Sequence, residues 1–74
     1  MTTKERKEIL RDFTKQKYEH LKFKVSMSYH EGEISADDMR MRKKFLTREA
    51  NISLAEIDQM NVKETKKLYS ELID

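Results

Sequence analysis

Helix-capping motifs recur along this chain, and almost nothing between them would interrupt a helix. Three times a capping side chain stands three residues before an acid: Ser35 before Asp38, Ser53 before Glu56, and Asn61 before Glu64. This spacing satisfies free backbone amides at a helix start and places negative charge in the first turn. Proline is absent, and glycine occurs once, at Gly32. The sequence therefore predicts an all-α fold.

The length of the chain limits this fold to one small domain, residues 1–74. A domain of this size buries only about 60% of the surface that its unfolded chain exposes. Charged residues make up 41% of the chain and hydrophobic residues 36%, a balance close to that of disordered chains. The apolar residues nevertheless recur at helical spacing. We therefore expect a folded chain with a thin core.

The first helix is predicted from about Lys4 to His30, capped by Thr2 or Thr3. Its apolar residues fall on one arc of the helical wheel, which includes Leu10, Leu21 and Val25. Because glycine adopts the left-handed conformation without strain, Gly32 is expected to end this helix.

The second helix is predicted over about Ala36 to Ala50, with Ser35 as its cap. The link to the first helix is short, so the two should form an antiparallel hairpin. Asn51 is expected to end the second helix, since asparagine tolerates the left-handed conformation.

A third segment is expected to begin at Ser53. Its apolar stripe, which includes Ile57 and Leu68, favours one helix through to Ile73, but the capping box at Asn61 favours a break or kink there. We expect the break. The predicted architecture is a small three-helix bundle. In it, the second helix lies along the C-terminal half of the first, and the last segments cover the N-terminal half.

Residues around the predicted hairpin turn are similar to a known short segment. The stretch 29–35 (YHEGEIS), followed by Asp37-Asp38-Met39 and Lys43-Lys44-Phe45-Leu46, resembles the short helical-hairpin segment called SHOCT. The resemblance implies a helical hairpin over about residues 29–46.

Composition argues against several function classes. Without cysteine there is no disulfide, thiolate chemistry or sulfur metal site, as is common in reducing compartments. No apolar run has the length of a signal peptide or a membrane span, so we expect a cytoplasmic protein with no membrane partner. A chain this short has little room for a water-excluded catalytic pocket. His20 and His30 cannot share a metal ion within one helix. No enzymatic activity, cofactor or metal is expected.

Charge runs from basic to acidic along the chain. Residues 1–30 hold eight Lys/Arg against four Asp/Glu, residues 31–50 five of each, and residues 51–74 three against five. This gradient fits either complementary faces of antiparallel helices or a basic face for an acidic partner. On the second helix, one arc is almost entirely basic and is a candidate phosphate-facing surface, formed by Arg40, Lys43, Lys44 and Arg48.

The segment that follows this basic arc suggests a regulatory, DNA-binding function. Residues 46–60 (LTREANISLAEIDQM) resemble the helix-turn-helix of many bacterial DNA-binding proteins, with Asn51 in the turn. Including the preceding basic residues, the resemblance covers about residues 43–60. It implies that Ser53 caps a recognition helix and offers its hydroxyl or amide to a phosphate, and that Gln59 reads bases. Of the other exposed recognition positions, Asp58 would repel phosphate.

The alternative is a protein-binding module: an inhibitor, adaptor or assembly factor of the kind that phages and plasmids encode. Met41 and Phe45 lie four residues apart, on a different side of the second helix from Met39 and Leu46. One of these two sides must face something other than the first helix. It could face the last helix, a partner protein or a second copy in a weak homodimer. The sequence leaves DNA and protein partners as open alternatives.

Overall fold

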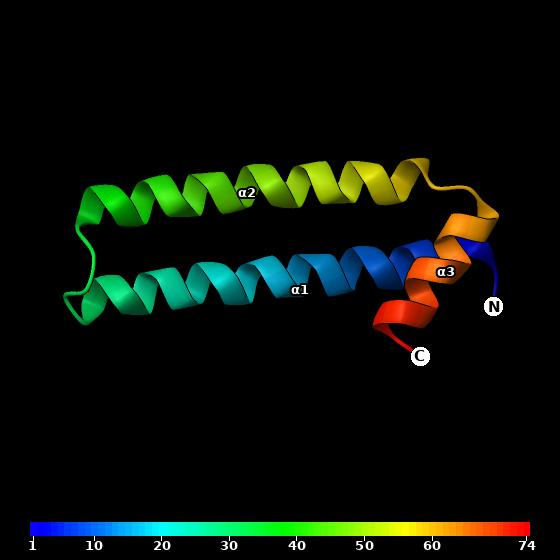
Figure 1. Ribbon diagram of the computed structural model, residues 1–74, viewed down its shortest axis with the longest axis horizontal. Helices are drawn as coiled ribbons and strands as arrows, with labels where there is room; N and C mark the ends of the chain where they lie inside the picture. Colours follow the sequence, from blue (N-terminus) through cyan, green and yellow to red (C-terminus); the bar gives the residue numbers. More distant parts are fainter.

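The computed structural model describes all residues from 1 to 74 and contains three helices and no strand. In Figure 1, α1 (Thr3–His30) and α2 (Ala36–Gln59) run antiparallel side by side, and α3 (Val62–Leu72) crosses the N-terminal end of α1. The molecule measures 45 × 21 × 14 Å, so its length is about that of α1 alone at 1.5 Å per residue. The all-α class, the long first helix and the antiparallel hairpin are confirmed.

The predicted caps form at the start of each helix. Thr2 caps α1, and Thr2 and Glu5 each accept the other's backbone N–H in a capping box. Ser35 Oγ accepts the Asp38 N–H at the start of α2, at 3.1 Å. A second capping box joins Asn61 and Glu64 at the start of α3. These bonds satisfy amides that no helical carbonyl reaches.

Gly32 ends α1 as expected. Its φ is +78°, and it is the chain's only residue with positive φ. The Gly32 N–H donates to the Tyr29 carbonyl at 3.0 Å, and the Glu33 N–H donates to the Ser28 carbonyl at 2.9 Å. This pair of bonds defines a Schellman motif, in which the left-handed residue turns the chain back toward the helix it has left.

The predicted end of the second helix at Asn51 is wrong, as is the predicted helix start at Ser53. α2 continues without interruption to Gln59 and lies along α1 over nearly its whole length, not only its C-terminal half. An asparagine inside a helix costs under about 1 kcal/mol relative to alanine. The packing of a further two turns against α1 outweighs that cost.

The packing between α1 and α2 follows one repeat. Residues that face the partner helix recur at intervals of three and four, the period of a coiled-coil seam. Those of α1 are Lys7, Leu10, Thr14, Tyr18, Leu21, Val25 and Ser28, and those of α2 are Met39, Lys43, Leu46, Ala50, Ser53 and Ile57, all buried or half-buried. The seam includes five polar side chains, which explains why the core is thin.

The expected break near residue 61 is confirmed. Met60 and Asn61 both have extended backbone, with ψ of 141° and 179°, and this lets α3 leave the line of α2. Thr65 of α3 is fully buried, and its hydroxyl donates to the Asn61 carbonyl at 2.7 Å. The Arg6 guanidinium lies over the Tyr69 ring, 5.9 Å from its centroid, and ties α3 to the start of α1.

Candidate functional site

Burial is confined to the end of the molecule that contains α3. The four buried residues are Leu10, Thr14, Ile57 and Thr65. α1 also holds the last turn of α2 at this end, because Arg11 Nη1 lies 2.6 Å from Asp58 Oδ2 and Lys7 Nζ donates to the Asp58 carbonyl at 3.0 Å. Cations beside the last carbonyls of a helix also compensate its dipole. We call the other part of the hairpin, residues 20–30 with 39–48, the open end.

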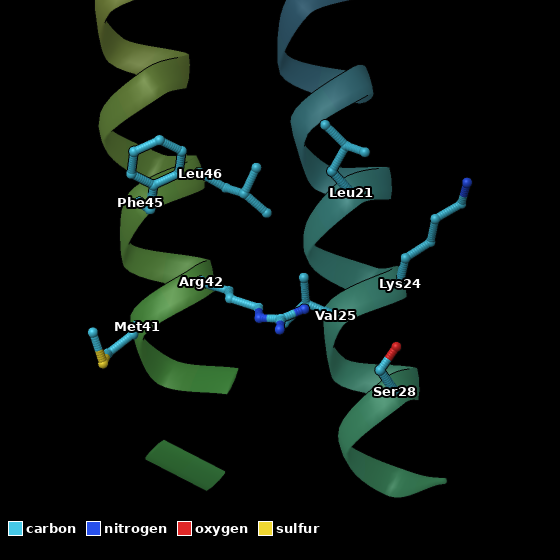
Figure 2. A pocket seen from close by; sticks show the side chains of 8 residues that line it. All are labelled: Leu21, Lys24, Val25, Ser28, Met41, Arg42, Phe45 and Leu46. Atoms are coloured by element: carbon cyan, nitrogen blue, oxygen red, sulfur yellow. The ribbon is translucent and has the colours of Figure 1, made fainter. Parts of the chain in front are cut away.

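The open end has a hollow between the two helices, with a volume of about 520 Å³. It is lined by Leu21, Lys24, Val25 and Ser28 of α1 and by Met41, Arg42, Phe45 and Leu46 of α2. In Figure 2, Leu21 and Leu46 point toward each other from the two helices, and Arg42 reaches across toward Val25. Met41 is 70% exposed and Phe45 59% exposed. We call this hollow the open groove.

The open groove lies on the same side of the hairpin as the cavity beneath α3. That cavity is lined by Thr14 and Lys17 of α1, Ser53 and Glu56 of α2, and Leu68 and Leu72 of α3, among others. Positions seven or eleven residues apart lie on one face of a helix, since they are about two or three turns of 3.6 residues apart. Lys17 is related in this way to Lys24 and Ser28, and Ser53 to Leu46 and Arg42. One groove therefore runs along the hairpin, and α3 covers only one end of it.

Basic side chains prevail in the two helical segments of the open end, and acids adjoin them at Glu19, Glu49 and the turn over residues 31–38. Residues 20–30 of α1 and 39–48 of α2 contain seven Lys or Arg and no Asp or Glu. Two of these cations pair with acids beyond these segments, Lys22 with Glu19 and Arg40 with Asp37. Lys24, Arg42, Lys44 and Arg48 have no carboxylate within 4 Å. Each helix therefore contributes one cation to the lining of the open groove, Lys24 and Arg42, and acids follow one helical turn beyond the lining, at Glu31, Asp38 and Glu49.

The structure separates three of the six residues that sequence suggested for nucleic-acid binding, Lys43, Ser53 and Gln59, from the other three. Lys43 is half-buried in the seam, where its Nζ donates to Ser26 Oγ at 3.1 Å, and Ser53 also faces inward. Arg40 is paired with Asp37. Gln59 is the last residue of α2. Arg40, Lys44 and Arg48 are exposed and follow one another at intervals of four on α2, and Lys44 and Arg48 lie beside a hollow that Ile52 and Ala55 also line.

The turn that the helix-turn-helix resemblance implies is not formed. Residues 43–59 belong to one continuous helix, so no second helix is set at an angle to the first. Asp58, one of the positions that would face DNA, accepts from Arg11 at 2.6 Å. Leu54 is half-buried, and its carbonyl accepts from Arg11 at 3.4 Å.

Ionisable side chains are not gathered into a reactive cluster. No three His, Cys, Asp or Glu side chains lie where they could hold a metal ion. The Thr2 backbone N–H, which donates to the Glu5 carboxylate at 3.0 Å, and secondly the Thr2 side chain hold the pKa of the Glu5 carboxyl below its ordinary value of 4.5. This carboxyl caps α1 at the end remote from the open groove. None of the three helices has an apolar stretch of the length needed to cross a bilayer.

Sequence reasoning identified Met41 and Phe45 but missed the α1 side of the groove and the two cations that line it. The spacing of apolar residues places Leu21 and Val25 in the core stripe of α1, and neither Lys24 nor Arg42 belongs to the predicted basic arc or to the predicted apolar side of α2. One signal points to the α1 side of the groove, the matching seven-residue spacing on the two helices. The chain matches no protein-family model, no curated protein and no solved structure.

Proposed function

We propose that this chain is a non-enzymatic protein-binding module that docks a partner on the open groove. One observation carries the proposal. Phe45 and Met41 stand largely in solvent at the edge of a hollow whose floor, formed by Leu21 and Leu46, is apolar. Fully burying a side chain such as Phe or Met is worth about 1.5–3 kcal/mol. A partner that covers these residues gains that free energy at little cost in rearrangement.

The surroundings of these two residues support a binding role. Interfaces commonly combine a few large apolar anchors with a polar rim that excludes water. Here Phe45 and Met41 would be the anchors, and Lys24 and Arg42 the rim. Both anchors lie within the long helix α2, which is already packed on α1, so the scaffold needs no folding upon binding.

DNA binding is the weaker alternative. Base reading by residues 43–60 would need a recognition helix, and these residues continue the helix that packs on α1. Of the basic arc, Arg40 and Lys43 already have partners within the chain. A contribution from Lys44 and Arg48 alone would give a small number of phosphate contacts and a shallow dependence on salt.

The test compares three single variants of the full chain as bait in cell extracts of the producing organism. Phe45→Asp and Met41→Asp place a charge at the groove, whereas Phe23→Asp does so at an equally exposed apolar residue outside it. We expect wild type and Phe23→Asp to retain the same protein and the two groove variants to lose it. Circular dichroism of each variant checks that the fold is kept.

Two results would contradict the proposal. The first is that no retained protein depends on Met41 or Phe45. The second is that the chain shifts a labelled duplex pool, that binding falls with a slope of about −0.9 per neutralised phosphate, and that Lys44→Glu with Arg48→Glu abolishes it. Sedimentation over a concentration series tests the weak homodimer separately.

A further inference from the structure

We propose that the partner of Met41 and Phe45 is a second copy of this chain, and that the two copies pair through antiparallel α2 helices. This inference rests on the proposed function, because both use the same two residues, and it names the partner. Two observations carry it. One is a second apolar stripe on α2, and the other is the order of the charges within and beside that stripe.

The second stripe follows a heptad repeat along α2. Positions 41, 45, 48, 52 and 55 are spaced alternately four and three residues apart and therefore share one face of the helix. We call these positions the outer seam. Met41, Phe45 and Ile52 occupy three of them and are 70%, 59% and 52% exposed, and Ala55 occupies the last. Since α2 is one unbroken helix, the positions stay aligned over about 20 Å.

The outer seam lies on the side of α2 that is turned away from α1. Each of its positions is two residues beyond a position that faces α1, which is about 200° around the helix. In Figure 2, Met41 points away from α1. α3 turns from the end of α2 toward α1 and packs on it, so it does not cover this side (Figure 1). The outer seam is therefore free to accept another helix.

Arg48 decides the direction of the pairing. It is the one charged residue of the outer seam, and in a parallel pair it would stand against Arg48 of the other copy. In an antiparallel pair centred between positions 46 and 47, Arg48 instead meets the Phe45 ring of the other copy, where a guanidinium is favourable. The same register sets Met41 against Ile52. Two-fold symmetry forms each of these contacts twice.

The charges beside the outer seam fit the same register. Arg42 and Glu49 adjoin it on one flank, and antiparallel pairing brings Arg42 of each copy beside Glu49 of the other. Neither residue has an ion-pair partner within its own chain. On the other flank, Lys44 meets the neutral Asn51. The pairing therefore gains two ion pairs and opposes no like charges along the seam.

Two features limit the strength of the pair. Near its ends, Asp37 approaches Asp58 of the other copy, although both carboxylates are already paired, with Arg40 and Arg11. The contact also uses only one helix of each copy, so its area is small. We therefore expect a weak dimer, formed by helices that are already folded.

Acids beside the outer seam disfavour an anionic partner. Asp38, Glu49 and Glu56 lie on the flank that faces the open groove, at helical spacing. They would repel the phosphates of a nucleic acid or of an anionic bilayer. A second copy, in contrast, supplies a cation at the position that Glu49 requires.

Disulfide trapping tests the direction of the pairing, because the chain has no cysteine of its own. Met41→Cys and Ile52→Cys are oxidised separately and as an equal mixture. We expect a linked dimer mainly in the mixture, since antiparallel pairing separates identical positions by about 16 Å along the helix. Thr47→Cys, exposed and off the outer seam, should not link with Ile52→Cys. Linkage of each variant alone, as efficient as in the mixture, would overturn the antiparallel pair.

Sedimentation equilibrium of the full chain measures the strength of the dimer. Arg42→Glu and Glu49→Arg should each weaken it about tenfold, because each sets like charges against one another twice. Their equal mixture should restore association, since the two variants complement each other. Lys15→Glu and Glu8→Arg make the same changes in charge at exposed residues of α1 and should show neither effect. A mixture that associates no better than its components would overturn the proposed register.

The remaining outcomes separate the failure of this inference from that of the proposed function. Phe45→Asp should dissociate the dimer and Phe23→Asp should not, and circular dichroism checks that both variants fold. A chain that stays monomeric at millimolar concentration overturns the inference, as does a dimer that survives Phe45→Asp. If extracts still yield another protein that Phe45→Asp releases, the proposed function stands. If neither a dimer nor such a protein is found, both proposals fall.

Discussion

The covered end and the open end of the hairpin are built from the same two helices, yet only the covered end has a buried core. At the covered end, Leu10 is fully buried and Ile57 is 3% exposed. At the open end no side chain is buried, and Leu21 and Leu46 are only half-buried although they occupy equivalent seam positions. The difference is α3, which packs on α1, buries Thr65, and lines the cavity at this end with Leu68 and Leu72.

The comparison shows how little two packed helices bury by themselves. A helix pair hides one stripe of each helix and leaves both flanks in water, so a third element is needed to complete a core. The polar contacts follow the same division. Arg11, Lys7 and Arg6 join α1 to the other helices at the covered end, whereas Lys43 to Ser26 is the one such bond at the open end.

The largest expected difference between the ends concerns stability. Leu10→Ala should lower the free energy of unfolding by about 2–5 kcal/mol, because it leaves a cavity that the thin core cannot close. Leu46→Ala, at a half-buried seam position, should cost clearly less. Urea unfolding followed by circular dichroism measures both. Equal losses would mean that the two ends are equally well packed.

The turn at the open end should be the next most sensitive feature. Gly32→Val should cost roughly 1–2 kcal/mol, since a β-branched residue resists φ of +78°. Nothing lies within 4 Å of a Cβ built at this position, so the cost is one of backbone conformation alone. Thermal unfolding measures it. A tolerated valine would mean that the chain turns without a left-handed residue.

The cap of α3 tests how strongly the covered end depends on that helix. Asn61→Ala removes the side-chain acceptor of the Glu64 N–H and should cost about 1 kcal/mol. Hydrogen exchange should show faster opening of amides in α3 than in the middle of α1. Ser35→Ala, the matched cap at the start of α2, should leave α3 protected. Protection of α3 that survives Asn61→Ala would show that packing alone holds it.

Phe45→Ala should change the free energy of unfolding by no more than about 0.5 kcal/mol, because the ring is largely in solvent. The same variant should weaken partner binding, which makes Phe45 a residue of the interface and not of the core. Chemical denaturation beside Phe23→Ala measures the effect. A loss comparable to that of Leu10→Ala would place Phe45 in the core of the free protein.

The smallest expected effect is a dependence on pH at the start of α1. The pKa of the Glu5 carboxyl is lowered from 4.5, first by its bond with the Thr2 backbone and then by that with the Thr2 side chain. A lowered pKa stabilises the folded state at pH above 4.5, and the effect is lost as pH falls through the lowered value. Acid titrations of unfolding should therefore differ between wild type and Glu5→Gln near neutral pH and converge at low pH. If the difference in unfolding free energy between wild type and Glu5→Gln is the same at every pH, the charge of Glu5 does not contribute to stability.

Local signals predicted most helix boundaries correctly and failed at two, the expected end at Asn51 and the expected start at Ser53. Thr2, Ser35 and Asn61 cap helices as expected, and Gly32 ends α1, because each acts through bonds to residues within three or four positions. Ser53 has the same capping pattern but lies inside α2. Two features distinguish Ser53 from Ser35: no glycine precedes Ser53 to end the helix, and the Ser53 side chain is half-buried in the seam with α1.

Only part of the open groove could be predicted from the sequence, because local patterns concern residues that are close together along the chain. The separation of Met41 and Phe45 from the side of Met39 and Leu46 could be read from spacing along a single helix. The involvement of Lys24 and Val25 depends on how α1 and α2 are aligned, and the pairing of Lys43 with Ser26 depends on it as well. Such contacts join residues more than fifteen positions apart and leave no local pattern.

The sequence by itself determined the helical class, the hairpin turn at Gly32 and the break at Asn61, because capping bonds and backbone conformation are properties of neighbouring residues. Only the tertiary structure decided that α2 runs through Asn51, and that α3 covers one end of the groove and leaves Met41 and Phe45 exposed at the other. Packing against α1 outweighs a weak local preference at Asn51. The length of α3, eleven residues, limits how much of the groove it can cover.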